Sequence, residues 1–208
     1  MGEDYFGIIP LMETYMTWAV WIAGAYFVGS VPFGFLIGKM RGVDVRTVGS
    51  KNIGATNVFR TVGKGWGLLA FLCDFLKGLL PTLAAMRVHG RFADLAVCVG
   101  LACVVGHTLT VFMRFRGGKG VATAFGMMIA LAPYPTLAAF GVFVVTVWLS
   151  HYISLGSMLA AATLGALVWF FPGTPLLRGI ATVIAVFVIV KHRSNIVRLL
   201  KGCENRIY

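Results

Sequence analysis

Acidic residues are scarce in this chain of 208 residues: 7 Asp and Glu stand against 18 Lys and Arg, and charged residues make up only 12% of the total. Soluble domains usually carry about a quarter charged residues, so the composition argues against a soluble globular domain. The hydrophobic content of 59% excludes a disordered chain. The formal net charge of +11 would suggest a nucleic-acid partner in a soluble protein. Whether this interpretation holds depends on where the basic residues lie in the chain.

Cysteine is also rare, and its spacing excludes the usual metal and redox motifs. The chain has four cysteines, Cys73, Cys98, Cys103 and Cys203, with no CxxC pair and no histidine cluster beside them. We therefore expect no disulfide, no metal site and no cofactor.

Long apolar runs dominate what is present. Residues 16–37 and 153–171 contain no charge over 22 and 19 positions, and a helix needs about 20 residues to cross a bilayer. The first 15 residues carry three acids and no Lys or Arg, unlike a secretory signal, so the first helix is predicted to be retained. Three more predicted spans cover residues 65–86, 95–113 and 172–190.

Residues 121–150 could form one long helix or two short ones that meet at Pro133 and Pro135. Two crossings place the C-terminal basic tail on the same side as the other basic loops, as the positive-inside rule requires. The two helices would then have roughly 12 to 15 residues each. The basic residues on that side are 14 of the 18: Lys39, Arg41, Arg46, Lys51, Arg60, Lys64, Arg114, Arg116, Lys119, Lys191, Arg193, Arg198, Lys201 and Arg206.

The predicted fold is therefore an all-α polytopic integral membrane protein with seven transmembrane helices, short loops, the N-terminus outside and the C-terminus in the cytoplasm. Residues 1–208 form one membrane-embedded domain in this prediction. Arg87, Arg91 and Arg178 lie outside, and Lys77 lies within a helix beside Asp74. The pair Asp74 and Lys77 reads equally well as an internal ion pair or as part of a polar cavity.

Three polar segments, all predicted on the cytoplasmic face, are richer than connecting loops require. Residues 49–60 combine glycines, short hydrogen-bonding side chains and Arg60, a composition suited to binding an oxyanion. Residues 116–123 place three glycines and Lys119 before an apolar helix, where successive backbone amides can hold an anion. The Walker A pattern is excluded because Met113 and Gly120 stand where it needs Gly and Ser or Thr.

The third segment, residues 191–204, continues the last span into the cytoplasm. His192 and Asn195 are three residues apart and share a helix face. Any one charge here is also explained by a basic juxtamembrane helix that contacts anionic lipid.

Together the three segments resemble the bacterial acyl-phosphate:glycerol-3-phosphate acyltransferase (PlsY) family over nearly the whole chain after residue 20. The resemblance includes GSVPFG at 29–34, DVR at 44–46, DFLKG at 74–78 and SLGS at 154–157. The chain departs from the family pattern at Lys51, where Gly is usual, at Leu109-Thr110, where Phe-Pro or a similar pair is usual, and at His151, where Arg is usual.

The resemblance implies transfer of a fatty acyl group from acyl phosphate to the 1-hydroxyl of sn-glycerol 3-phosphate, which forms lysophosphatidic acid and phosphate in the first step of phospholipid synthesis. It implies a bacterial inner-membrane enzyme whose active site is on the cytoplasmic face and which uses neither acyl-CoA nor acyl carrier protein directly. A soluble enzyme that makes acyl phosphate is the implied partner. No nucleic acid is expected.

We interpret the segments as a site for direct transfer, because acyl phosphate is already activated and the protein mainly has to position two anions. The donor phosphate is assigned to Ser50, Lys119 and the backbone amides of Gly117 and Gly118. Glycerol phosphate is assigned to Thr56, Asn57, Arg60, Ser157 and His192, with Asn195 near the reacting atoms. Proton removal by a substrate phosphate is favoured over removal by His192, because no histidine and carboxylate pair is evident.

Two alternatives stay open. A phosphate or organic-anion transporter also places basic glycine-rich segments beside short broken helices, although this chain shows no internal repeat. A structural lipid-binding bundle would bind anionic lipid without turnover.

Overall fold

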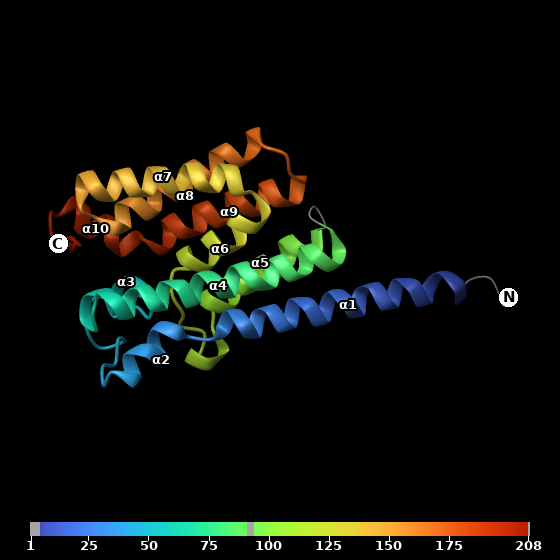
Figure 1. Cartoon of the computed structure of the whole chain (residues 1–208), viewed down its shortest axis with the longest axis horizontal. Coiled ribbons are helices and arrows are strands. Elements are labelled where there is room, and N and C mark those ends of the chain that lie inside the picture. Colours follow the sequence, from blue (N-terminus) through green and yellow to red (C-terminus); the bar gives the residue numbers. More distant parts are fainter. Residues whose placement is uncertain (1–4, 91–93, 208) are drawn as a thin grey trace.

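The computed structural model describes residues 5–90 and 94–207, so Arg91 lies outside the described residues. The described chain is helical (Figure 1). Its helices are α1 (Tyr5–Ser30), α2 (Phe33–Met40), α3 (Ala55–Thr61), α4 (Lys64–His89), α5 (Asp94–Thr108), η1 (Val111–Met113), α6 (Val121–Leu131), α7 (Pro133–Ser150), α8 (Ile153–Leu167), η2 (Val168–Phe170), α9 (Pro175–Lys191) and α10 (Arg193–Leu200).

By length and composition, five segments of the described residues can cross a membrane: Thr14–Met40, Lys64–His89, Asp94–Met113, Pro133–Ser150 and Ile153–Phe170. Helices α9 and α10, bent by 52° at their junction, add a sixth. The remaining predicted span is α6, which has 11 residues and is about 16 Å long. All-helical membrane architecture is confirmed, whereas seven crossings depend on this short helix.

The expectation of two similar short helices around the prolines is wrong. The chain breaks at Ala132, and Pro133 and Pro135 occupy the first turn of α7. The first turn of a helix has no internal partner for its N–H groups, so prolines are accepted there. Helix α7 therefore reaches 18 residues, and only α6 is short.

The helices pack in two groups. One contains α1, α4, α5 and α6, in which α5 lies against α1 and α4, and α6 lies against α4. The other contains α7, α8 and α9, in which α8 lies against both neighbours (Figure 1). Backbone contact holds α4 to α6: a Cβ added to Gly78 would lie 2.1 Å from the Thr123 carbonyl oxygen, and one added to Gly126 would lie 2.1 Å from that of Phe75. Small residues at such crossings are typical of membrane helices.

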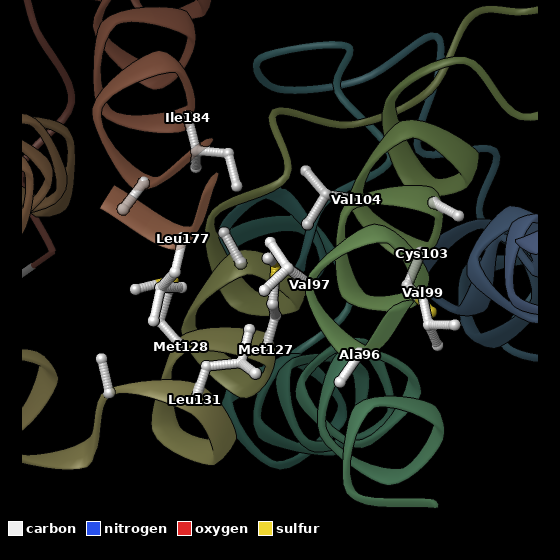
Figure 2. Packing of buried hydrophobic residues seen from close by; sticks show 14 of the residues in the cluster. Ala96, Val97, Val99, Cys103, Val104, Met127, Met128, Leu131, Leu177 and Ile184 are labelled. Carbon is white, nitrogen blue, oxygen red and sulfur yellow. The ribbon is translucent and has the colours of Figure 1, made fainter. Parts of the chain in front are cut away.

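The buried core joins α5 and α6 to α9. Figure 2 shows Val97 and Val104 of α5, Met127 and Met128 of α6, and Leu177 and Ile184 of α9, all members of one apolar cluster. The two helix groups meet along this cluster and enclose a cavity beside it, which is lined by residues of both groups.

Candidate active site

A cavity of about 460 Å³ lies between the two helix groups. Most of its wall is apolar and includes Phe71 from α4, Phe125 from α6 and Phe143 from α7, although Asp74 and His107 also line it. At one end the lining becomes polar. That end holds Ser50, Asn52, Thr56, Asn57, Arg60, Lys119, Ser154, Ser157, His192, Asn195 and Glu204.

A second cavity of about 280 Å³ adjoins the polar end and is strongly basic. It is lined by Ser50, Asn52, Lys119, Val190, Lys191, Arg193, Ser194, Asn195 and Arg198. Four of these residues, Ser50, Asn52, Lys119 and Asn195, line both cavities. An apolar groove thus meets an anion-attracting pocket at a shared polar wall.

Lys119 and Asn195 form the centre of that wall. The Lys119 Nζ donates a hydrogen bond to Asn195 Oδ1, and Asn195 Nδ2 donates to Glu204 Oε1 at 2.9 Å. Glu204 also pairs with Arg198 Nε at 2.7 Å and accepts from Ser154 Oγ at 3.2 Å. These bonds hold the Asn195 amide in one orientation, with its oxygen toward the lysine and its nitrogen toward the carboxylate.

Positive charge in this region is only partly neutralised. The pKa of Lys119 is lowered to about 8, first by burial, with Arg198, Arg60 and Lys191 adding to the effect and Glu204 opposing it. Burial likewise lowers the pKa of Arg60, whose Nη2 donates to the Asn205 carbonyl at 2.8 Å. An arginine nevertheless stays protonated throughout the accessible range. A buried excess of cations favours an anionic ligand.

His192 lies at the junction of α9 and α10 and is buried. Its Nδ1 is 2.7 Å from the Val188 carbonyl oxygen. A carbonyl can only accept, so Nδ1 carries a proton, and Nε2 is the ring nitrogen left for a ligand. The partner of His192 is thus a backbone carbonyl and not a carboxylate.

The hydrogen bonds of Asn57 indicate a structural role beside its predicted contact with substrate. Its Nδ2 donates to the Val45 and Val48 carbonyls at 2.8 and 3.2 Å, and its Oδ1 accepts from the Ser50 amide at 2.9 Å. Asn57 is only 1% exposed. These bonds engage its side chain in shaping the segment that contains Ser50, while Asn57 also lines the larger cavity. Its contact with substrate stays a prediction.

The hydrogen bonds of the Gly117 and Gly118 amides argue against their predicted role in binding the donor phosphate. The Gly117 amide donates to the Thr108 carbonyl at 3.2 Å, and the Gly118 amide donates to the His107 carbonyl at 3.1 Å. Neither N–H is then available to a phosphate. The glycines are needed for packing instead, since a Cβ on Gly117 would lie 2.0 Å from the His107 carbonyl oxygen. Neither residue is part of the lining of the two cavities.

All three departures from the family pattern have a defined local structure. His151 ends α7 with a φ of +63°, and its carbonyl accepts from the Ile207 amide at 2.9 Å. Lys51 has a φ of +56°, a left-handed conformation in which Gly is the least strained residue. Thr110 is buried, and its Oγ1 donates to the Ser30 carbonyl at 2.6 Å, which ties the exit of α5 to the end of α1. All three positions therefore have a defined backbone conformation.

The sequence assigned no site role to Glu204, Ser154 or His107 and left Asp74 open between an ion pair and a polar cavity; all four residues line the larger cavity, and Asp74 is also paired with Lys77. Glu204 is the one acidic residue after Asp94 in the whole sequence. A single carboxylate in a basic tail could have indicated that it pairs with a basic residue of the site. The other three lie on separate helices, and only the packing brings them to the cavity. The structure does bring Ser50, Thr56, Arg60, Lys119, Ser157, His192 and Asn195 together as predicted.

Comparisons with known proteins agree with this geometry. A model of the family described as glycerol-3-phosphate acyltransferase matches residues 19–202. A glycerol-3-phosphate acyltransferase from Trichlorobacter lovleyi is 50% identical over 186 residues, which cover 89% of this chain and 95% of the relative. One from Aquifex aeolicus is 45% identical over 184 residues, with coverage of 88% and 95%.

Two crystal structures share the fold. They are of PlsY (YgiH), an integral membrane glycerol 3-phosphate acyltransferase, in its glycerol 3-phosphate form and its lysphosphatidic acid form. Their TM-scores are 0.88 and 0.85 at 41% and 40% identity, and each match covers 91% of this chain and 95% of the other. These matches favour acyl transfer over anion transport. The chain belongs to the glycerol-3-phosphate acyltransferase family of integral membrane proteins.

Proposed function

We propose that the protein transfers a fatty acyl group from an acyl phosphate to the 1-hydroxyl of sn-glycerol 3-phosphate and releases lysophosphatidic acid and inorganic phosphate. The observation that carries this proposal is the shared wall of Ser50, Asn52, Lys119 and Asn195 between the apolar cavity and the basic cavity. A donor that is both lipid and phosphate fits such a junction better than a soluble thioester does. The names of the relatives support the acceptor, glycerol 3-phosphate.

The acyl tail of the donor lies along the apolar cavity in this proposal, and its phosphate lies at the shared wall. Ser50 and Lys119 contact that phosphate. Lys191, Arg193 and Arg198 of the basic cavity add positive potential on the side where free phosphate leaves. The lysine is a compact point charge that can follow the phosphate as its own charge grows.

Glycerol 3-phosphate occupies the polar end of the larger cavity. Arg60 offers a planar set of donors for its phosphate, and Thr56 and Ser157 offer hydroxyl groups. The Ser157 hydroxyl already donates to the Ile153 carbonyl at 2.8 Å, which leaves its oxygen free to accept a hydrogen bond. His192 presents Nε2 as an acceptor for a glycerol hydroxyl.

Transfer proceeds in one step without an acyl-enzyme. The 1-hydroxyl oxygen attacks the acyl carbonyl carbon, the bond from that carbon to the phosphate oxygen breaks, and the hydroxyl proton passes to the departing phosphate. Asn195 and Lys119 stabilise the oxyanion and the leaving group at the reacting centre. The backbone partner of His192 supports proton transfer to the substrate phosphate over a histidine and carboxylate relay.

The proposed orientation has seven crossings, the N-terminus outside and the C-terminus in the cytoplasm of a bacterial inner membrane. The start of α1 and the C-terminal tail lie at opposite ends of the molecule (Figure 1), as an odd number of crossings requires. Helices α2, α3 and α10 lie at the same end as the C-terminus (Figure 1). A soluble enzyme on that side would supply the acyl phosphate.

A donor comparison on purified protein tests the proposal. Palmitoyl phosphate with glycerol 3-phosphate is expected to give lysophosphatidic acid and phosphate in equal amounts, and palmitoyl-CoA is expected to give neither. Lys119→Ala and Asn195→Ala should lose most of the turnover, whereas Lys64→Ala, an exposed lysine at the start of α4, is the matched control and should keep it. Equal use of palmitoyl-CoA would refute the donor assignment, wild-type turnover in Lys119→Ala would refute the site, and an acyl group on Ser50 would refute direct transfer.

A further inference from the structure

Three charged or titratable side chains are buried together beneath the proposed site. Asp74 and Lys77 of α4 are 2% and 4% exposed, and His107 at the end of α5 is 5% exposed. Lys77 Nζ lies 2.8 Å from Asp74 Oδ1, and His107 Nδ1 lies 3.5 Å from the same oxygen. Charged residues inside a membrane helix are costly and need a role beyond filling space.

On one side this cluster reaches the segment that contains Ser50. Lys77 Nζ donates to the Val31 carbonyl at 2.8 Å, at the break between α1 and α2. Helix α2 then packs against the first polar segment, because a Cβ on Gly34 would lie 2.0 Å from the Ile53 carbonyl oxygen. Lys77 is thereby linked to that segment through the α1–α2 break and α2.

On its other side the cluster reaches Lys119. The His107 carbonyl accepts from the Gly118 amide at 3.1 Å, and the His107 ring packs so closely on Gly118 that a Cβ there would lie 2.2 Å from Nε2. Gly118 directly precedes Lys119. The backbone that carries the lysine therefore rests on the histidine.

We infer that Asp74, Lys77 and His107 act as positioning residues that fix the Ser50 segment and the Lys119 segment relative to each other. This inference rests on the proposed function, in which the two segments bring donor and acceptor together. Each segment keeps its own ligand groups when the cluster is weakened, but the spacing between the two substrates changes. A misplacement of about 1 Å between reacting groups can lower a rate by about 100-fold.

Two other roles are distinguishable from positioning, because Asp74 and His107 also line the larger cavity. Asp74 could bind a substrate hydroxyl, or the pair could act as a general base. Both roles need a group that is free to face the substrate, whereas Asp74 Oδ1 is already paired with Lys77 and the His107 ring packs on Gly118. The positioning role uses these contacts as they stand.

The test compares steady-state kinetics of Asp74→Asn, the double variant Asp74→Asn with Lys77→Met, and His107→Gln. The double variant removes both charges, so it remains informative where Asp74→Asn leaves an unpaired buried lysine and does not fold. Asp94→Asn, an exposed aspartate at the other end of α5, is the matched control. Folding is checked by circular dichroism and gel filtration, and rates are expressed per folded protein.

For positioning we expect kcat to fall about 10- to 100-fold in the folded variants, while KM for palmitoyl phosphate and for glycerol 3-phosphate stays close to wild type. The pH profile of His107→Gln should keep its shape. Wild-type kcat in the folded variants would overturn the inference and leave a purely structural cluster. A selective rise in KM for one substrate would make Asp74 a ligand, and a loss of about 1,000-fold or more with a lost acidic limb would make His107 the base.

The wild-type enzyme separates this inference from the proposed function. Failure of wild type to use palmitoyl phosphate refutes the proposed donor and leaves the positioning test to be run with the donor that wild type does use. If wild type turns over normally and the variants are unaffected, the positioning role is refuted and the proposed function stands.

Discussion

The charge state of Lys119 gives a quantitative prediction for the pH dependence of the enzyme. Its pKa is lowered to about 8 by burial and by neighbouring cations. At pH 7 about nine-tenths of the molecules then carry the protonated lysine, and at pH 9 only about one-tenth do. If the protonated form binds the donor phosphate, kcat/KM for palmitoyl phosphate should fall about tenfold from pH 7 to pH 9.

The direction of the pH dependence follows from which protonation state of Lys119 is active. The ammonium form is the one that attracts phosphate, so activity is complete below pH 7 as far as this group is concerned and declines as pH rises through 8. Glycerol 3-phosphate does not contribute to the decline, because a phosphate monoester loses its second proton near pH 6 and stays dianionic above that.

Lys119→Arg separates this titration from other effects, because the guanidinium keeps its charge over the whole range. Its absolute rate should be lower, since an arginine fork does not replace a point charge. Its alkaline limb near pH 8 should disappear. The assay is the initial rate of lysophosphatidic acid formation between pH 6.5 and 9.5, with enzyme-free blanks for donor hydrolysis. The same alkaline limb in wild type and Lys119→Arg would refute the reasoning.

Three further substitutions have expected outcomes. Asn195→Ala removes the partner of Lys119 and should lower kcat about 10- to 100-fold while thermal unfolding stays cooperative; an unchanged kcat would contradict its place at the reacting centre. Lys51→Gly relieves a φ of +56° and should stabilise the fold by about 1 kcal/mol, seen as a higher Tm, whereas a lower Tm would show that the lysine side chain matters more than its backbone. Gly118→Ala puts a methyl group 2.2 Å from His107 Nε2 and should cost about 1–3 kcal/mol, and an unchanged Tm would mean that the ring moves aside freely.

Much of the architecture could be predicted because a bilayer imposes a simple rule on sequence. Every backbone group in hydrocarbon must be bonded within the chain, so long apolar runs become helices. The predicted span at residues 153–171 corresponds to α8 with η2, and the one at residues 172–190 corresponds to α9. The helix boundary at Pro133 and Pro135 could not be predicted from the sequence, because prolines that end one helix can equally begin the next.

Some residues of the site could also be predicted from the sequence, and others could not. Ser50, Arg60, Lys119 and His192 were predicted because glycines, basic residues and short polar side chains stand out against an apolar chain. Asn57, Gly117 and Gly118 share that composition, but their polar groups bond to the protein itself. Composition marks a polar segment as unusual without showing which of its groups are already occupied.

By itself the sequence determined the membrane-helix class, the concentration of positive charge in three segments and the kinship with glycerol-3-phosphate acyltransferases, because these depend on composition and on short motifs in order. Only the tertiary structure decided which groups face the cavities. Glu204 reaches Asn195 because the tail folds back after α10, and Asp74 meets His107 because α4 packs on α5. Such contacts join residues far apart in sequence or on separate helices, and they depend on close packing that no local pattern records.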